Sequence, residues 1–442
     1  MRRGLRATGR ALIAAGLLAL GAGVLLRPEA RAPRADGYYD ALAAELRAHA
    51  PARPIALVDL DRLDANLAAV RSQLKPPQRL RLVTKSLPSL ELIRYALERS
   101  GATGLMAFHA PFLPDLLRAT APEVDVLLGK PVAAAEAAEF YAALAPEQAT
   151  AASQRIQWLV SDVAMLDDYL ALAAARGLVL RINLEIDVGL HRGGARNAEE
   201  LRALLARLRS APERARFSGF MGYDGHVAHA PGFGPLASRE ERVREAFADV
   251  LARYAEFVAI ARSEFAELVP AAPTWNGAGS LTYTLYPPDS IVNDLALGGA
   301  LLMPSTYDVF TLASHRPALF LAAPVLKRIE PAEVPLLGPL GRLWRWWDPN
   351  RAVAFYLNGG GWAADLVYPS GLATNPLLES PANENLLPTL SRLDGSPLQT
   401  LRTGDFVLYR PRQGDSLTQF ETIHLLRGGL LAGTWRPFPR RL

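Results

Sequence analysis

The chain has 442 residues, half of them apolar and 21% charged, which is enough for two or three domains or for one large barrel with an appended domain. It has no cysteine, which excludes a thiol nucleophile, a disulfide framework, an iron–sulfur cluster and cysteine-ligated zinc. Residues 1–36 hold seven arginines, and the rest of the chain holds 41 basic and 42 acidic residues, so the net charge of +4 does not indicate nucleic-acid binding.

The N-terminal segment has the layout of an export signal. Residues 11–26 form an uncharged run of sixteen that follows four arginines. As a helix this run would span roughly 24 Å, which is less than the ~30 Å hydrocarbon core of a bilayer. We therefore expect residues 1–36 to be a cleavable signal or a marginal membrane anchor, and the protein to be exported, periplasmic or membrane-anchored. The alternative is a buried N-terminal helix of a cytoplasmic protein.

Strand and helix patterns alternate through the middle of the chain. A helical stretch over residues 38–50 precedes a strand over residues 54–60 and a helix that ends near Leu74. Eight further strand-like runs follow, over residues 80–86, 104–109, 125–130, 156–161, 178–187, 217–223, 273–280 and 292–302. Helical patterns separate most of them, over residues 89–99, 132–144, 163–176, 198–209 and 239–268.

Short apolar strands that alternate with amphipathic helices predict a parallel sheet covered on both faces. Eight such units match a closed (β/α)8 TIM-like barrel, which is typically about 250 residues long. An open Rossmann-like sheet is the alternative, but no G-x-G-x-x-G pattern follows the early strands.

The composition changes from Phe310 onward, where proline and tryptophan become frequent. Strand-like segments lie over residues 318–329, 352–357 and 405–410, and a hairpin is expected about Gly428 and Gly429. The sequence therefore predicts a barrel with its N-terminal strand and helix over residues 37–309, and a separate C-terminal β domain over residues 310–442.

Lysine is rare in this chain, where only Lys75, Lys85, Lys130 and Lys327 accompany 44 arginines. Lys85 lies at the end of the first barrel strand, and barrels of this type carry their chemistry at the carboxyl ends of the strands. A lysine that is desolvated there can act as a nucleophilic amine. Lys130 also ends a strand, and either lysine could instead be a solvated surface charge.

Glycine-rich segments occur at the seventh and eighth strands. They contain Gly277, Gly279 and Ser280 after the seventh strand, and Gly298 and Gly299 within the eighth. Loops in these two places are the usual phosphate site of such barrels, because glycine lets the backbone approach the oxygens. A Gly-Ala-Gly-Ser loop alone is typical of an ordinary turn. A phosphate site opposite a strand-end lysine is what pyridoxal phosphate (PLP) requires.

Four segments resemble a known family, over residues 54–61 with Asn66, 83–86, 185–192 and 219–226. From Pro54 to Pro437 the sequence resembles the barrel-type (fold type III) PLP-dependent family of alanine racemase, D-threonine aldolase and eukaryotic-type D-serine dehydratase. The resemblance is strongest to the aldolase and dehydratase branch.

The resemblance implies roles for four side chains. Lys85 would bind PLP covalently, Arg192 would lie near the phenolic oxygen of the cofactor, and Tyr223 and His226 would reach the active site. Each has an ordinary alternative: Arg192 as a loop arginine paired with a nearby carboxylate, Tyr223 as core packing, and His226 as a hydrogen-bonded loop histidine.

The metal pair of that branch is altered in this chain. The branch typically carries a His-x-Cys pair after a Gly-Asp-x-Val strand, where this chain has Gln413 and Asp415. Glutamine is a poor ligand for zinc or manganese compared with imidazole, so we expect no tightly bound divalent metal.

The resemblance implies a lyase that acts on D-configured 3-hydroxy amino acids, by retro-aldol cleavage of the D-threonine aldolase type. The alternatives are an amino-acid racemase or a D-serine dehydratase of the same fold, and a non-catalytic protein that binds PLP or another phosphorylated metabolite. The resemblance also implies a small amino-acid substrate and a homodimer, and no nucleic-acid partner is expected.

Overall fold

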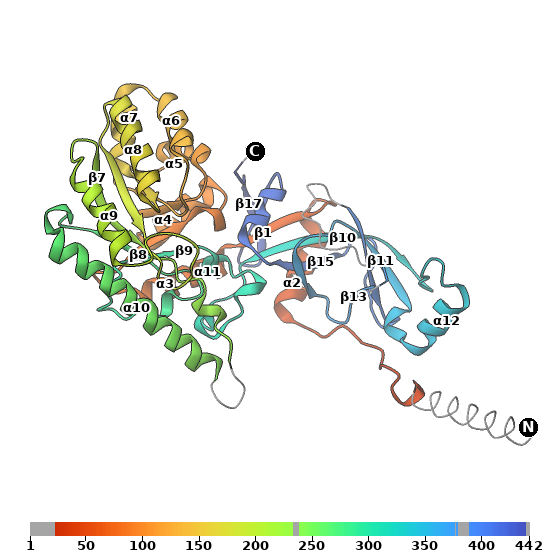
Figure 1. Cartoon of the computed structure of the whole chain (residues 1–442). Helices are drawn as coiled ribbons and strands as arrows, with labels where there is room; N and C mark the ends of the chain where they lie inside the picture. Colours follow the sequence, from red (N-terminus) through yellow and green to blue (C-terminus); the bar gives the residue numbers. More distant parts are fainter. Residues whose placement is uncertain (1–22, 233–237, 376, 379–388, 439–442) are drawn as a thin grey trace, which may run out of the picture. The chain divides into compact units, whose positions relative to one another are not determined.

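The structure, a computed structural model, describes residues 23–232, 238–375, 377–378 and 389–438. It has two compact units (Figure 1). The described parts of Val58–Leu319, Gln413–Leu425 and Thr434–Leu442 form the barrel unit, and those of Met1–Leu57, Phe320–Arg412 and Leu426–Gly433 form the sheet unit. Most of the predicted signal or anchor run lies outside the described residues. Among the described helices, none is both long and apolar enough to cross a membrane.

Eight parallel strands close the barrel in chain order. They are β2 (Arg79–Val83), β3 (Gly104–Ala107), β4 (Asp125–Leu128), β5 (Ile156–Val160), β6 (Leu180–Glu185), β7 (Ala215–Met221), β8 (Thr274–Gly277) and β9 (Asp294–Leu297). The pairing of β9 with β2 closes the ring. Each strand falls on one of the eight predicted runs, and the predicted fold class, a (β/α)8 barrel followed by a β domain, is confirmed.

Helices lie around the outside of the strands (Figure 1). They are α3 (Leu60–Gln73), α4 (Leu90–Ser100), α5 (Leu113–Ala119), α6 (Ala134–Ala142), α7 (Pro146–Arg155), α8 (Val163–Arg176), α9 (Ala198–Arg209), α10 (Arg239–Glu264) and α11 (Gly299–Leu302). Local signals set their ends. In α8, the Asp162 side chain accepts a hydrogen bond from the backbone N–H of Met165 at 2.9 Å, and Gly177 ends the helix with a φ of 62°.

The sheet unit is built on a nine-stranded sheet in the order β13-β14-β11-β10-β1-β16-β17, with β15 pairing with β10 and β12. The strands of this sheet are β1 (Ile55–Asp59), β10 (Leu319–Ile329), β11 (Val353–Asn358), β12 (Ala364–Tyr368), β13 (Ala373–Thr374), β14 (Leu390–Gly395), β15 (Phe406–Pro411), β16 (Ile423–Arg427) and β17 (Leu430–Trp435). The predicted hairpin about Gly428 and Gly429 is the turn between β16 and β17. The unit also holds α2 (Gly37–His49) and α12 (Gly338–Trp347), of which α12 was not predicted.

The division of the chain differs from the predicted boundaries in two places. Residues 37–57 join the sheet unit instead of the barrel, because Leu42 and Leu46 of α2 pack in one core cluster with Phe320 and Phe406. In the other direction, Gln413–Leu425 returns to the barrel unit. There Gly414 lies so close to the turn after β2 that a Cβ on it would be 2.5 Å from the Ser86 carbonyl oxygen.

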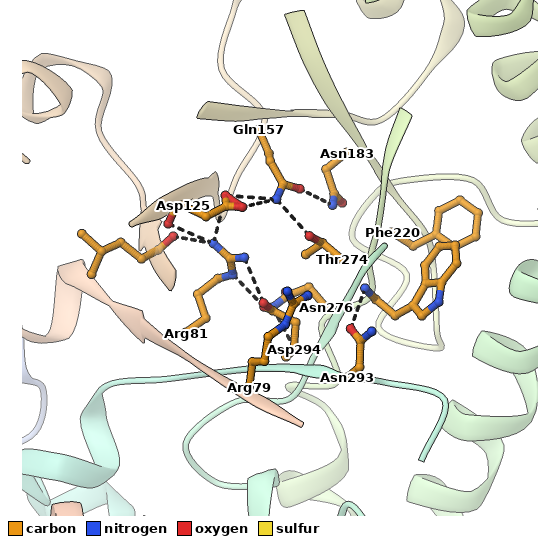
Figure 2. Close-up of polar contacts among 12 residues, drawn as sticks. Arg79, Arg81, Asp125, Gln157, Asn183, Phe220, Thr274, Asn276, Asn293 and Asp294 are labelled. Atoms are coloured by element: carbon orange, nitrogen blue, oxygen red, sulfur yellow. Dashed lines mark hydrogen bonds and ion pairs between the residues drawn. The ribbon is translucent and has the colours of Figure 1, made fainter. Parts of the chain in front are cut away.

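A buried polar network fills part of the barrel interior (Figure 2). Arg81 in β2 donates from Nε and Nη2 to the two carboxylate oxygens of Asp294 at 2.6 and 2.9 Å. Its Nη1 donates to the Leu105 carbonyl at 2.9 Å. A buried ion pair is tolerated when further hydrogen bonds satisfy its polar atoms, and this one has them.

Amide side chains extend the network across the barrel (Figure 2). Gln157 donates to Asp125 and to the Thr274 hydroxyl, and Asn183 donates to Gln157. The amide of Asn276 donates to Asp294 at 2.6 Å, so Asp294 holds both Arg81 and Asn276. Asn276 also lines the cavity described next, and the network therefore supports the floor of that cavity.

Candidate active site

Lys85 follows β2 directly, in the short 3-10 turn Thr84–Ser86. The strand ends at Val83, earlier than predicted, and the Thr84 hydroxyl joins the turn to β3 by donating to the Met106 carbonyl at 3.1 Å. The Lys85 Nζ lies 4.7 Å from the centroid of the Phe108 ring. The amine is therefore at the carboxyl ends of the barrel strands, beside an aromatic face.

A small cavity that is partly open to solvent lies at these strand ends in the barrel unit. Of the side chains and loops predicted for the site, it brings together Lys85, Arg192, Tyr223, Gly279, Ser280 and Gly298. Lys130, the other strand-end lysine, is not among the described residues that line it. The structure thus separates the two lysines that the sequence left equivalent.

The surroundings of Lys85 lower the pKa of its amine below the ordinary 10.5. Lys85 is partly exposed at the mouth of the cavity, but the protein around its amine removes enough water to disfavour the charged form, and this is the main cause. The positive charge of Arg192 acts in the same direction. The carboxylate of Asp415 acts against them and raises the pKa. At a given pH, the Lys85 amine is therefore neutral more often than the amine of a solvated lysine. The neutral amine is the form that acts as a nucleophile.

Two substitutions should shift the pKa of Lys85 in opposite directions. Asp415→Asn removes the charge that raises this pKa, so the uptake of PLP by the protein should reach its plateau at lower pH than in the wild type. Arg192→Gln removes a charge that lowers it, so the plateau should move to higher pH. The measurement is the rate of PLP uptake against pH, with Asp415→Glu as a control that keeps the wild-type profile. Shifts in the same direction would contradict this electrostatic account.

Arg192 and Tyr223 lie together at the cavity. The Arg192 guanidinium carbon lies 5.1 Å from the centroid of the Tyr223 ring, a cation–π distance. Its contact with Glu185 is long, at 4.0 Å, and the Glu185 carboxylate instead accepts a 2.5 Å hydrogen bond from the Ser161 hydroxyl. Burial raises the pKa of Tyr223, so its hydroxyl stays protonated at neutral pH. Both side chains thus border the cavity, and the roles that the resemblance implies for them stay predictions.

The loop that carries Arg192 is organised by Asp187. Its carboxylate accepts hydrogen bonds from the backbone N–H groups of Gly189 and His191 and contacts the His191 ring at 2.7 Å. Burial alone would raise the pKa of Asp187, but these hydrogen bonds lower it. Gly189 has a φ of 118°, a conformation that favours glycine. These contacts fix the turn immediately before Arg192.

The glycine segments provide a closely approached backbone. A Cβ on Gly298 would lie 2.7 Å from the Val83 carbonyl oxygen, and a Cβ on Gly279 would lie 3.1 Å from the Tyr223 ring. The Ser280 hydroxyl accepts a hydrogen bond from the backbone N–H of Gly298 at 3.1 Å, which joins the β8 and β9 loops. Close packing thus excludes a Cβ at Gly298 and crowds one at Gly279, and both residues line the cavity.

Asp224 supports the loop after β8, and the sequence did not indicate it. Its carboxylate is fully buried and accepts hydrogen bonds from the hydroxyls of Thr282 and Tyr286, each at 2.9 Å. These hydroxyls in turn accept from the backbone N–H groups of Gly279 and Ala278 at 3.0 and 3.1 Å. Ala278 has a φ of 67°, which is unfavourable for a non-glycine residue, so these contacts hold a strained backbone in place.

Burial raises the pKa of Asp224 from 3.8 to about 6, and this gives a pH-dependent term in stability. A raised pKa in the folded state means that stability is fully present below pH 3.8 and is lost as the pH rises through about 6. We therefore expect wild type to gain about 2 kcal/mol of unfolding free energy relative to Asp224→Asn between pH 7 and pH 4. Denaturant unfolding of both proteins at several pH values measures this difference, and a constant difference would contradict the raised pKa.

Three predicted site residues do not line the cavity. Gly277 is buried within β8 against Val292 and Tyr286, and Gly299 packs against Tyr307. His226 directs Nε2 toward Gly189, and its buried Nδ1 has no hydrogen-bond partner among the described residues. Burial lowers the pKa of His226, so the ring is largely neutral at pH 7. Its predicted catalytic role stays a prediction.

Two aromatic residues of the cavity were missed from the sequence. Phe108 follows β3, and Tyr307 follows α11; burial raises the pKa of Tyr307 to about 12. Phe108 could have been predicted as a site residue from the sequence. It lies near the end of the second predicted barrel strand, just as Lys85 lies near the end of the first. Tyr307 had no such signal, because it is eight residues beyond Gly299 in a segment without a predicted element.

The altered metal pair also lies in the barrel unit. Gln413 and Asp415 are both exposed, and the charge of Asp415 raises the pKa of Lys85 and of Tyr307. Among the described residues, no three His, Asp or Glu side chains gather as a metal site. The carboxylate at this position is therefore near the amine.

The residues of the cavity fit PLP. Lys85 offers an amine of lowered pKa, Arg192 a cation for the phenolic oxygen, and Gly279, Ser280 and Gly298 a close-packed backbone for the phosphate. The observation that supports this fit is that one cavity is lined by Lys85 and Arg192 together with Gly279, Ser280 and Gly298.

Solved structures share this fold across nearly the whole chain. D-threonine aldolase from Filomicrobium marinum has a TM-score of 0.66 and 17% identity, covering 87% of this chain and 96% of its own. D-threo-3-hydroxyaspartate dehydratase from Delftia sp. HT23 has a TM-score of 0.61 and 18% identity, covering 88% and 98%. Alanine racemase from Bacillus anthracis has a TM-score of 0.59 and 16% identity, covering 87% and 98%.

Sequence comparison assigns the family. No curated protein matches the chain in sequence. The family model described as "Alanine racemase, N-terminal domain" matches residues 58–287, which is more than half of the chain and spans β2 to β8 with the residues of the cavity up to Ser280. The chain therefore belongs to the alanine racemase N-terminal domain family, the barrel-type (fold type III) family of PLP-dependent enzymes.

Proposed function

We propose that the protein is a PLP-dependent lyase that cleaves D-configured 3-hydroxy amino acids by retro-aldol chemistry. The observation that carries the proposal is a single cavity, at the carboxyl ends of the barrel strands, lined by Lys85, Arg192, Tyr223 and the Gly279–Ser280 segment. Two proteins of the same fold support the substrate class, since their names specify D-threonine and D-threo-3-hydroxyaspartate, both D-configured 3-hydroxy amino acids.

When bound in this cavity, PLP supplies an electron sink that stabilises negative charge at the Cα of an amino acid. Lys85 would hold it through its amine, Arg192 would lie near its phenolic oxygen, and Ser280 with its neighbouring glycines would accommodate its phosphate. The Tyr223 hydroxyl, which stays protonated because its pKa is raised, is placed to donate a hydrogen bond. These residues bind and orient the amino acid and do not by themselves select the bond that breaks.

Bond selection depends on the proton of the substrate hydroxyl. Retro-aldol cleavage needs a base that removes this proton, whereas dehydration needs an acid that assists its departure as water. In our proposal Asp415 is the base, because its neighbour Gly414 packs against Ser86, next to Lys85, and because its charge raises the pKa of Lys85. His226 and Tyr223 are the alternatives, and His226 would have to turn from its packing against Gly189.

The products formed from D-threonine test the proposal. The PLP-loaded protein should convert D-threonine into glycine and acetaldehyde, and Asp415→Asn should slow this step more than it weakens PLP binding. Deuterium exchange at Cα without cleavage would instead establish a racemase, and release of 2-oxobutyrate with ammonia would establish a dehydratase. Treatment with a chelator, followed by addition of divalent metals, shows in the same assay whether a metal takes part.

A further inference from the structure

The helix α12 carries an exposed apolar face on the sheet unit. Leu336 just before the helix, and Leu340, Leu343 and Trp346 within it, are 105%, 68%, 59% and 53% exposed. Their spacing of four, three and three residues places the helical members on one side of the helix. Leucine and tryptophan side chains of this size are costly to expose as a group, so such a face indicates a binding surface.

A second exposed apolar segment contacts the same helix. Val24, Leu25 and Leu26 are 52%, 87% and 72% exposed. The Trp347 indole N–H donates to the Gly23 carbonyl at 2.6 Å. These three residues and the four of the preceding paragraph therefore form one surface, which we call the α12 surface.

The charges at the α12 surface are basic. Between residues 336 and 347 the charged residues are Arg345 and the exposed Arg342. The exposed carboxylates of Glu29 and Glu333 flank the surface in sequence, and Asp348 after the helix pairs with Arg351 at 3.5 Å. Next to Leu26, the exposed Arg27 places its guanidinium carbon 5.5 Å from the centroid of the Trp346 ring. Helices that lie in the interface of an anionic membrane typically have leucine and tryptophan side chains flanked by arginine.

We infer that the α12 surface binds a membrane surface that carries anionic phospholipids. The leucine and tryptophan side chains enter the boundary between headgroups and acyl chains, and Arg27 and Arg342 contact the lipid phosphates. The uncharged run of residues 11–26 ends at this surface, so a lipid-bound N-terminal run and α12 can engage the same bilayer. A membrane accounts for both the apolar face and its basic edge, and the inference does not depend on the reaction that the barrel carries out.

A probe on α12 itself tests this inference in the full chain. Because the chain has no cysteine, Leu343→Cys introduces a single site for an environment-sensitive fluorophore. The matched control is Leu430→Cys, at a residue of β17 in the same unit that is 60% exposed. With vesicles of phosphatidylcholine and phosphatidylglycerol, the label at position 343 should shift to the blue and be quenched by quenchers attached to the lipids. The label at position 430 should not change.

A second measurement tests whether the α12 surface prefers anionic lipid. Arg342→Gln should weaken the partition of the labelled protein onto these vesicles by about fivefold, equivalent to about 1 kcal/mol, and added salt should reduce the difference. Equal shifts at position 343 with vesicles of phosphatidylcholine alone would overturn the preference for anionic lipid. A label at position 343 that stays in water beside vesicles would overturn the inference. A label at position 343 that is already shielded from water without vesicles would also overturn the inference, since another protein surface would then cover the helix.

Discussion

Replacement of Lys85 by alanine is expected to remove the visible absorption of protein-bound PLP and to lower the turnover of D-threonine by at least about a thousandfold. Lys85 is the lysine of the cavity, and its amine is made more reactive by the burial that lowers its pKa. Alanine keeps the turn after β2, because the hydrogen bond from Thr84 to Met106 does not involve the lysine side chain. The loss should therefore be chemical and leave the fold intact, which circular dichroism can check.

Lys130→Ala is the matched control for this prediction. Lys130 also follows a barrel strand, and its loss removes the same charge, but it is not among the described residues that line the cavity. The control should keep both the absorption and the turnover of the wild type. Loss of the absorption in Lys130→Ala and its retention in Lys85→Ala would show that the cavity described here is not the PLP site.

The barrel was predictable because its signals are local and repeated. Each strand is a short apolar run, and α8 and α9 begin and end at the predicted residues because Asp162 and Asn197 cap them. The helix α7 was missed, since alanine is the only hydrophobic residue type in PEQATAASQR apart from its first proline, and the helix packs on β5 and β6. The division into units could not be predicted, because it depends on where α2 packs and not on any pattern within residues 37–49.

The candidate site was predictable where chemistry requires a rare residue type. Lysine is scarce, and glycine is needed where the backbone passes Val83 or Tyr223, so Lys85, Gly279 and Gly298 could be identified. Gly277 and Gly299 carried the same signal and serve packing instead. Asp224 was missed because its role arises from hydrogen bonds to residues 58 and 62 positions away, which no local pattern records.

Substitution of Arg81 by methionine is expected to lower the free energy of unfolding by about 3–5 kcal/mol. Both Arg81 and Asp294 are 2% exposed, so the substitution leaves a buried carboxylate without the guanidinium that neutralises it. Denaturant unfolding measures the loss. Arg79→Met is the matched control: Arg79 is an exposed residue of the same strand, and its replacement should change stability by less than about 0.5 kcal/mol.

A double-mutant cycle separates the ion pair from simple loss of packing. If the cost arises from the unpaired carboxylate, Asp294→Asn should recover about 1–3 kcal/mol when it is added to Arg81→Met. Additive losses would mean that methionine merely packs poorly in the barrel. Because Asp294 also holds the amide of Asn276, which lines the cavity, the unpaired carboxylate should disturb the cavity floor as well. Arg81→Met should therefore weaken PLP binding, although Arg81 is not among the residues lining the cavity, and the double variant should restore part of it.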